Sequence, residues 1–198
     1  MTLTITDEQD ASDMVRLREG HDAALSDLMM RNGERLFHYL IRQLGNETEA
    51  ADLAQEAFVR VYQNRAKFDS RQKFSTWLYA IATNLSRDRL RWRARHPQVS
   101  LEEEDVQSGS TLLQHLADAQ LTPDQKLESN ERAATVRKAI AALPEELRTP
   151  IILAEYEGRS HVEIATILNC SPKAVEMRIY RARNQLRVDL EGLMHAIR

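Results

Sequence analysis

Hydrophobic residues recur at intervals of three and four along most of this 198-residue chain, and this spacing places side chains on one face of an α-helix. The chain has only 6 Gly and 5 Pro, so it offers few tight turns for a fold made of many short strands. Three hydrophobic stripes lie in residues 21–44, in residues 47–64 and from residue 74 onward. The sequence therefore predicts an all-α protein, because three facing helices are enough to enclose a small core.

A change of composition divides the chain into two helical domains. Pro97 is expected to end the first domain, and an acidic run at residues 102–105 follows it without a sustained hydrophobic period. Such a segment is typical of a flexible linker, either one that is only solvated or one with a function of its own. Helical patterns then resume. We expect domains at 1–96 and 122–198, joined by an acidic flexible linker at 97–121.

The second domain contains the pattern of a helix-turn-helix. Ser160 and Glu163 have the spacing of a capping box that opens a short helix. Residues 169–170 turn the chain, and residues 171–172 suit the start of a long helix. At 100° per residue, one face of that helix is hydrophobic and the opposite face carries Lys173, Met177, Tyr180, Arg181 and Asn184. These side chains suit phosphates and base edges, although an ordinary helical hairpin with a solvated face would show them too.

The net charge of −3 conceals an uneven distribution. The charge is −7 for residues 1–59, +8 for 60–100, −6 for 101–135, −1 for 136–170 and +3 for 171–198. Two basic segments separated by an acidic one indicate two surfaces that could each contact a polyanion.

The first basic segment is also rich in aromatic residues. Of the chain's 11 Phe, Trp and Tyr residues, seven lie within it or at its edge: Phe58, Tyr62, Phe68, Phe74, Trp77, Tyr79 and Trp92. Cations among aromatic rings suit unpaired bases, which offer a face for stacking and a phosphate to neutralise. Most of these rings lie on the hydrophobic stripes, however, and are expected in the core.

Several classes of protein are not expected. No hydrophobic run approaches the roughly 18 residues of a membrane-spanning helix, and the N-terminus lacks the pattern of a secretory signal. The single cysteine, Cys170, cannot form an internal disulfide, which favours a cytoplasmic protein. There is no glycine-rich phosphate loop and no clustering of His or Cys. We therefore expect no cofactor, no metal, no small-molecule substrate and no enzymatic activity.

The order of these motifs resembles the extracytoplasmic-function (ECF) type of bacterial RNA polymerase sigma factors, in the sigma-70 family. Residues 52–62 are similar to the polymerase-binding helix of that family, and residues 74–84 to its promoter-melting segment. Residues 143–148, 157–165 and 178–183 are similar to its terminal helix-turn-helix. The resemblance implies a sigma region 2 domain on the clamp of the largest polymerase subunit at the minus-ten element. It also implies a region 4 domain on the flap of the second-largest subunit at the minus-thirty-five element.

The resemblance also implies site residues. Asp52, Gln55 and Glu56 match the positions that bind core polymerase. The expected contacts to the minus-ten DNA are Lys67, Arg71, Lys73, Asn84, Arg87 and Arg91, with Asn84 near the flipped base. The expected contacts to the minus-thirty-five DNA are Lys173, Met177, Arg178, Tyr180, Arg181 and Asn184. Met177 stands where the family often has a small polar residue.

Together these inferences predict a dissociable bacterial initiation factor, of the stress-response kind, that binds core RNA polymerase and promoter DNA and is held by an anti-sigma factor. Pro150 is a departure from the family, and it is expected either to kink the helix that begins near Pro144 or to restart it after Thr149. Two alternatives remain. A stand-alone helix-turn-helix regulator explains residues 160–190 but gives no role to residues 52–56. A helical adaptor that binds only proteins gives no role to the basic face of the last helix.

Overall fold

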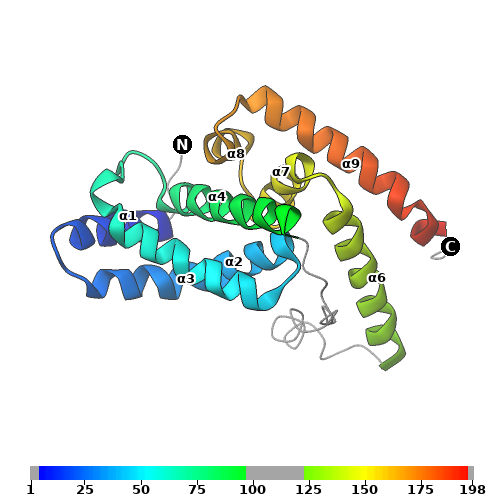
Figure 1. The fold of residues 1–198 in the computed structure, drawn as a ribbon, viewed down its shortest axis with the longest axis horizontal. Coiled ribbons are helices and arrows are strands. Elements are labelled where there is room, and N and C mark those ends of the chain that lie inside the picture. Colours follow the sequence, from blue (N-terminus) through cyan, green and yellow to red (C-terminus); the bar gives the residue numbers. More distant parts are fainter. Residues whose placement is uncertain (1–4, 97–122, 196–198) are drawn as a thin grey trace.

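Every regular element in the computed structural model, which describes residues 5–96 and 123–195, is a helix (Figure 1). The all-α prediction is therefore confirmed, whereas the expected linker at 97–121 lies outside the described residues. The first helix group contains α1 (Ile5–Arg18), α2 (Ala23–Leu44), α3 (Glu47–Gln63), η1 (Arg65–Lys67) and α4 (Phe74–Arg95). The second helix group contains α6 (Pro123–Ala142), α7 (Glu145–Glu155), α8 (His161–Leu168) and α9 (Pro172–His195).

The three hydrophobic stripes of the first group form α2, α3 and α4, as predicted. Gly45 ends α2 in the left-handed conformation, with φ of 66°, which suits a residue without a side chain. Asn46 then begins α3, because its side-chain oxygen accepts a hydrogen bond from the Glu49 N–H at 2.8 Å. The stripes face one another, and their fully buried side chains include Leu28, Leu36, Tyr39, Leu40, Val61, Phe74 and Leu78.

Helix α1 was not predicted, because its sequence has no continuous hydrophobic stripe. Among residues 6–18 of this helix, whose burial the structure describes, the fully buried hydrophobic side chains are Met14 and Leu17. Arg31 of α2 holds it in place, with its Nε 2.8 Å from Asp10 and a second ion pair to Asp13. Burial raises the pKa of Asp10 even though Arg31 and Asn32 hydrogen-bond to it and lower it. Packing and ion pairs therefore stabilise a helix that the spacing of its hydrophobic residues does not predict.

Helix α7 corrects one expectation, because it runs without interruption through Pro150. The predicted restart after Thr149 is wrong, and the helix ends at Glu155 rather than near residue 157. Pro150 is the sixth residue of the helix, so its missing N–H leaves one carbonyl, that of Glu146, without its helical partner. Pro150 and its neighbours Ile151, Ile152 and Leu153 are buried, and this packing offsets the lost hydrogen bond.

The predicted helix-turn-helix is present. The Ser160 N–H donates to the Glu163 carboxylate at 2.9 Å, and the Glu163 N–H donates to Ser160 Oγ at 3.3 Å, so the capping box is confirmed. Asn169 turns the chain in the left-handed conformation, with φ of 50°. Ser171 Oγ accepts from the Ala174 N–H at 3.2 Å at the start of α9, which continues beyond the predicted end near Leu190 to His195.

The capping box supplies a first testable prediction. Replacing Ser160 by Ala is expected to lower the free energy of unfolding by about 1 kcal/mol, since one helix N–H loses its acceptor. Urea denaturation followed by circular dichroism measures this change, and Ser160→Thr, which keeps an acceptor, is the control. Equal midpoints for wild type and Ser160→Ala would contradict it.

The same residues give a pH dependence. Burial raises the pKa of Glu163, but hydrogen bonds from Ser160 and the nearby Lys73 outweigh it, so the pKa lies below its ordinary value of 4.5. The ionised Glu163 therefore stabilises the fold fully above about pH 4.5, and this contribution is lost as the pH falls through the lower folded-state pKa.

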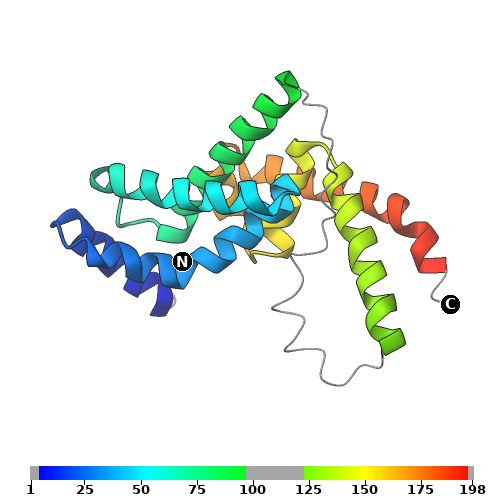
Figure 2. The ribbon, with the colours of Figure 1, turned by 60° about the horizontal axis from the view of Figure 1, so that its bottom comes forward.

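The two helix groups pack against each other. Helix α8 lies at the N-terminal end of α4, and α7 lies against α2 (Figures 1 and 2). Helix α6 leads away from the first group in both views and contacts α9. The described part of the chain is thus a closed arrangement in which two of the expected minus-ten contacts, Lys73 just before α4 and Arg87 within it, face the second helix group.

Candidate nucleic-acid interface

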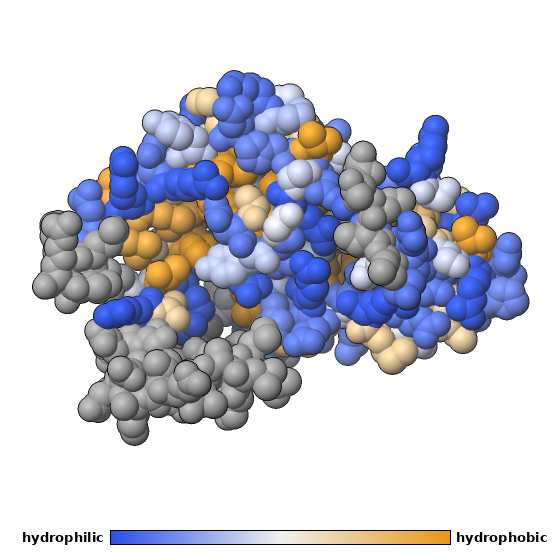
Figure 3. Space-filling model, turned by 180° about the vertical axis from the view of Figure 1, so that it is seen from behind, coloured by the Kyte–Doolittle hydropathy of each residue, from blue (hydrophilic) through white to orange (hydrophobic). Residues whose placement is uncertain are grey.

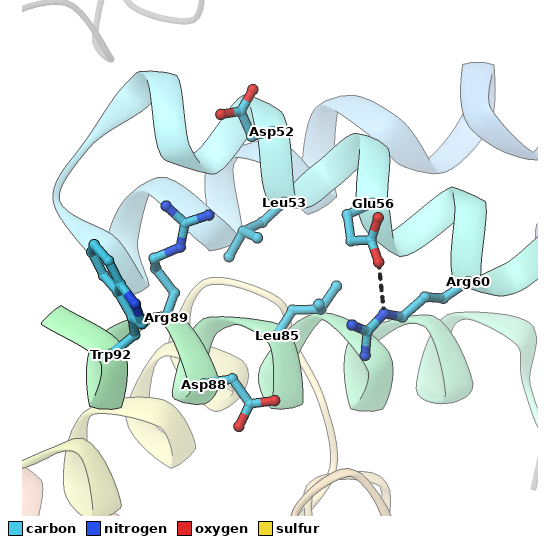
Figure 4. A pocket seen from close by; sticks show the side chains of 8 residues that line it. All are labelled: Asp52, Leu53, Glu56, Arg60, Leu85, Asp88, Arg89 and Trp92. Atoms are coloured by element: carbon cyan, nitrogen blue, oxygen red, sulfur yellow. Dashed lines mark hydrogen bonds and ion pairs between the residues drawn. The ribbon is translucent and has the colours of Figure 1, made fainter. Parts of the chain in front are cut away.

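An acidic patch and a groove mark the outer side of α3. Asp52 and Gln55 are exposed, and Glu56 is half-buried and pairs with Arg60 at 2.9 Å. Leu53 and Leu85 form the hydrophobic floor of a groove between α3 and α4 (Figure 4). Its charged and aromatic rim consists of Asp52, Glu56, Arg60, Asp88, Arg89 and Trp92. A hydrophobic floor with a charged rim suits a helix of a partner protein.

Sequence reasoning missed the α4 side of this groove. Leu85, Asp88, Arg89 and Trp92 lie at steps of three and four, so a helical projection of α4 would have placed them on one face. Because this segment is basic, the sequence predicted a nucleic-acid surface here instead of a protein-binding groove. In the structure these residues line the same groove as Asp52 and Glu56 of the predicted acidic patch.

The loop before α4 carries two of the predicted DNA contacts. Lys67 is exposed and donates to Asn64 Oδ1 at 2.9 Å, and Arg71 is exposed and pairs with Asp69 at 2.7 Å. Hydrogen bonds from Arg71 lower the pKa of Asp69 to about 2, so this carboxylate stays ionised and paired with Arg71. Under the loop lie the rings of Phe68, Phe74 and Trp77, whose centroids are 5.3–6.4 Å apart.

The burial of the aromatic residues shows which of them lie in the core and which could stack on bases. Phe58, Phe68, Phe74 and Tyr79 are buried, so they belong to the core as expected. Trp92 is different, because 43% of it is exposed and it stacks on His96 with the ring centroids 4.8 Å apart. Most of the aromatic residues therefore position the loop and α4 rather than offer a surface for bases.

The predicted minus-ten residues of α4 fall into two classes. Asn84 and Arg91 are exposed, with Arg91 only 3.9 Å from Asp88 on the same helix. Arg87 instead lies with its Nε 2.6 Å from the Glu145 carboxylate of α7. The structure thus places Arg87 in an ion pair with the second helix group.

Lys73, immediately before α4, is held in the same way. Its Nζ lies 3.2 Å from Glu163 of α8 and 3.3 Å from Asp7 of α1. Burial lowers the pKa of Lys73, but the two carboxylates outweigh it and raise the pKa above its ordinary value. Lys73 is therefore a charged lysine that is already neutralised in this arrangement.

The outer face of α9 is presented as the helical projection predicts. Tyr180 is 61% exposed and Met177 41%, whereas Val175, Ile179 and Ala182 on the opposite face are at most 2% exposed. The other predicted residues differ from one another: Lys173 and Arg181 are exposed, and Asn184 and Arg178 are half-buried. The Arg178 guanidinium lies 3.7 Å from Cys170 Sγ, and Lys173 pairs with Glu176 at 2.9 Å.

A shallow groove beside this face includes two residues that sequence reasoning missed. His161, at the start of α8, lines it together with Met177, Tyr180 and Arg183. Arg183 pairs with Glu155 of α7 at 2.6 Å. Its place in a run of arginines was visible in the sequence, but its ion pair with α7 was not.

One face of the second group carries a hydrophobic area. Figure 3 shows hydrophobic side chains gathered over α6 and α9, on the face opposite to that of Figure 1, within a mostly hydrophilic surface. Val136 and Leu186 are half-buried hydrophobic residues of these two helices. In residues 5–96 and 123–195 no group of His, Cys, Asp and Glu is arranged to hold a metal ion. No helix in the described part is long and hydrophobic enough to cross a membrane.

Comparison with protein families matches both helix groups. The family model described as Sigma-70 region 2 matches residues 28–96, and the one described as Sigma-70, region 4 matches residues 133–186. The chain is 37% identical to the ECF RNA polymerase sigma factor SigW of Bacillus subtilis, over 90% of this chain and 95% of the relative. It is 33% identical to the RNA polymerase sigma-H factor of Pseudomonas aeruginosa, over 96% and 98% of the two chains.

Solved structures show the same likeness. CnrH, solved in complex with the cytosolic domain of CnrY, has a TM-score of 0.65 and 27% identity, and the match covers 93% of this chain and 98% of that one. The sigma factor RpoE of Bartonella quintana, solved in complex with the anti-sigma factor NepR, has a TM-score of 0.62 at 23% identity. That match covers 84% of this chain and 96% of RpoE, and it shows a shared fold.

Proposed function

The chain belongs to the extracytoplasmic-function group of the sigma-70 family of RNA polymerase sigma factors, and from this membership we propose how its surfaces share the work of promoter-specific initiation. Residues 1–96 form the region 2 domain, which binds core polymerase and recognises and melts the minus-ten element. Residues 122–198 form the region 4 domain, which recognises the minus-thirty-five element, and residues 97–121 link them. The factor acts in the cytoplasm, where its polymerase is, and catalyses no reaction of its own.

The observation that carries this assignment is the separation of two differently built surfaces. The groove beside Asp52 has a hydrophobic floor and a charged rim, which suits a protein partner, so we assign it to the clamp of the largest polymerase subunit. The outer face of α9 offers Tyr180, Arg181 and Lys173 to duplex DNA. The hydrophobic surface over α6 and α9 remains for the flap of the second-largest subunit.

Promoter opening follows from the surface of α4 and the loop before it. Capturing one unstacked base and its strand offsets the few kcal/mol that unstacking costs, so no hydrolysis is needed. Asn84 is exposed on α4 and its amide can both donate to and accept from a base edge. Lys67, Arg71 and Arg91 are exposed cations that neutralise the strand. An anti-sigma factor that covers these faces would hold the protein inactive.

Run-off transcription with purified core polymerase on a library of genomic fragments tests the proposed function. The expected result is a set of promoters that is used only when this protein is added. The protein alone should bind the same fragments poorly, which separates a sigma factor from a stand-alone regulator. If no fragment is transcribed above the level of core polymerase alone, the proposal fails.

Reversing the charge of Asp52 tests the groove. Asp52→Lys is expected to weaken binding to core polymerase about tenfold. The exposed carboxylate would attract basic residues of the polymerase clamp, whereas a lysine at this position would repel them. No cation of the described residues pairs with Asp52, so the change removes no ion pair among these residues. Titration of labelled protein with core polymerase measures it, with Glu19→Lys in an exposed turn as the control. Equal affinities of both variants for core polymerase would contradict the proposal that this groove binds the polymerase.

Asn84 should act at the opening step. Asn84→Ala is expected to slow promoter opening about tenfold while core binding changes little, since one base-edge hydrogen-bond pair is lost. Stopped-flow fluorescence of a probe in the minus-ten region measures opening, and Gln63→Ala, an exposed amide at the end of α3, is the control. Equal losses in opening and in core binding would remove the role given to Asn84.

A further inference from the structure

Glu157, which follows α7, joins the two helix groups from a buried position. Only 6% of the residue is exposed, and its carboxylate accepts a hydrogen bond of 2.5 Å from the Tyr79 hydroxyl of α4. Two arginines of α2 surround it: Arg42 lies 3.5 Å from one carboxylate oxygen and Arg35 4.0 Å from the other. Burial and the neighbouring Glu157 both raise the pKa of Tyr79, so this hydroxyl keeps its proton. A buried carboxylate needs such partners, and all three belong to the other helix group.

Two cation–π contacts and one hydrogen bond surround Glu157. The Arg42 guanidinium lies 4.4 Å from the centre of the Tyr156 ring, and that of Arg159 lies 4.7 Å from the centre of the Tyr79 ring. Arg159 also donates to Ser75 Oγ of α4 at 2.8 Å. Each contact joins α2 or α4 to the residues around Glu157. We refer to this set, centred on Glu157, as the junction.

The junction holds two carboxylates of the second group against predicted DNA contacts of the first. Glu163 lies 3.2 Å from Lys73, and Glu145 lies 2.6 Å from Arg87. The side chains of Lys73 and Arg87 are only 15% and 23% exposed. A carboxylate and a DNA phosphate compete for the same N–H donors. While the groups are closed, these two cations are therefore withheld from a DNA strand.

The junction also has features of a contact that can separate. Four buried side-chain polar atoms of the described residues have no hydrogen-bond partner: Gln43 Nε2, Thr76 Oγ1, Arg148 Nε and Arg159 Nε. Gln43 and Arg159 belong to pairs that cross between the groups, since Gln43 accepts from the Thr149 hydroxyl at 3.2 Å. Each such buried atom costs free energy that water would recover on opening, so the two at the junction favour separation of the groups.

We propose that Glu157 is the latch of an autoinhibited form, in which the second helix group closes over α4 and occupies Lys73 and Arg87. Opening the latch frees these cations for the promoter strand. This inference rests on the proposed function, because it concerns the regulation of the same minus-ten surface. Core polymerase, which must hold the two groups apart to reach two promoter elements, favours the open form.

The variant Glu157→Gln tests the latch, because it keeps the shape of the side chain and removes its charge. Opening is measured by energy transfer between dyes on the full chain, attached through Glu19→Cys and Val188→Cys in a Cys170→Ser background. Both labelled positions are exposed. The loss of a charge-assisted contact is expected to shift the closed–open equilibrium about tenfold and to lower energy transfer. Glu146→Gln, an exposed residue in the first turn of α7, should leave energy transfer unchanged.

A second measurement uses a fluorescent single-stranded oligonucleotide of mixed sequence at low salt. Its apparent affinity for the free protein follows the open fraction, so Glu157→Gln should bind up to about tenfold more tightly than wild type. Tyr79→Phe, which removes only the hydroxyl, should change both readouts in the same direction. This variant keeps the inference testable even if Glu157→Gln proves unfolded by circular dichroism.

The two proposals fail in different ways. If a folded Glu157→Gln or Tyr79→Phe variant shows the energy transfer and the oligonucleotide affinity of wild type, the latch is overturned. Neither measurement uses polymerase. If instead the latch opens as expected but no variant supports run-off transcription, the proposed function fails while the latch stands.

Discussion

Replacing Arg181 by Glu is expected to reduce transcription from a two-part promoter by a hundredfold or more, while core polymerase is bound as by wild type. Arg181 is exposed on the outer face of α9, beside Tyr180. Within the described residues no carboxylate pairs with it, whereas Lys173 and Arg183 are engaged with Glu176 and Glu155. The change removes a contact to DNA and adds repulsion from phosphate, together about 3 kcal/mol.

Run-off transcription on a promoter from the fragment library measures the effect, and titration with core polymerase shows that assembly is intact. Arg137→Glu is the matched control, because it makes the same charge change at an exposed residue of α6. A protein that binds only other proteins would be indifferent to Arg181→Glu. Unchanged transcription would therefore favour the adaptor alternative and would remove DNA binding from α9.

Replacing Phe74 by Ala is expected to lower the free energy of unfolding of the first helix group by about 3–5 kcal/mol. The Phe74 side chain is fully buried and lies at the first residue of α4. Its ring packs against those of Phe68 and Trp77, with centroids 6.2 and 6.4 Å away. The total stability of a domain is about 5–15 kcal/mol, so this loss leaves a substantial unfolded fraction. The loop that carries Lys67 and Arg71 would lose its support.

Urea denaturation followed by tryptophan fluorescence suits this measurement. The chain has 2 Trp, Trp77 and Trp92, and both lie in α4, so the signal reports on the first helix group. Phe37→Ala is the control, because Phe37 is only half-buried and its loss should cost less. If the two variants unfold at the same urea concentration, the packing described around Phe74 is not what stabilises α4.

Much of the fold followed from short-range patterns. The ends of α2, α3 and α8 are set by Gly45, Asn46 and Ser160, whose effects act within one helical turn. The exposure of Tyr180 and Met177 followed from the angle between successive residues of a helix. Such features depend on neighbours in the sequence, and a pattern can therefore predict them.

Other features escaped prediction because they depend on contacts between distant residues. Helix α1 is held by Arg31, which lies in the next helix and pairs with Asp10 and Asp13. Helix α7 continues through Pro150 because buried neighbours offset the missing hydrogen bond. The sequence predicted a nucleic-acid surface for the α4 half of the groove, because no pattern within α4 shows that this half lies beside Asp52 of α3.

The sequence by itself determined that the fold is helical, where α2, α3, α4 and the helix-turn-helix lie, which face of α9 is polar, and that an acidic segment separates two basic ones. Only the tertiary structure decided that Lys73 and Arg87 of the first basic segment are paired with Glu163 and Glu145 rather than left exposed. The physical reason is the range of the interactions. Helix formation and capping act across a few residues, whereas an ion pair forms wherever docking of the helices brings two charges within about 4 Å.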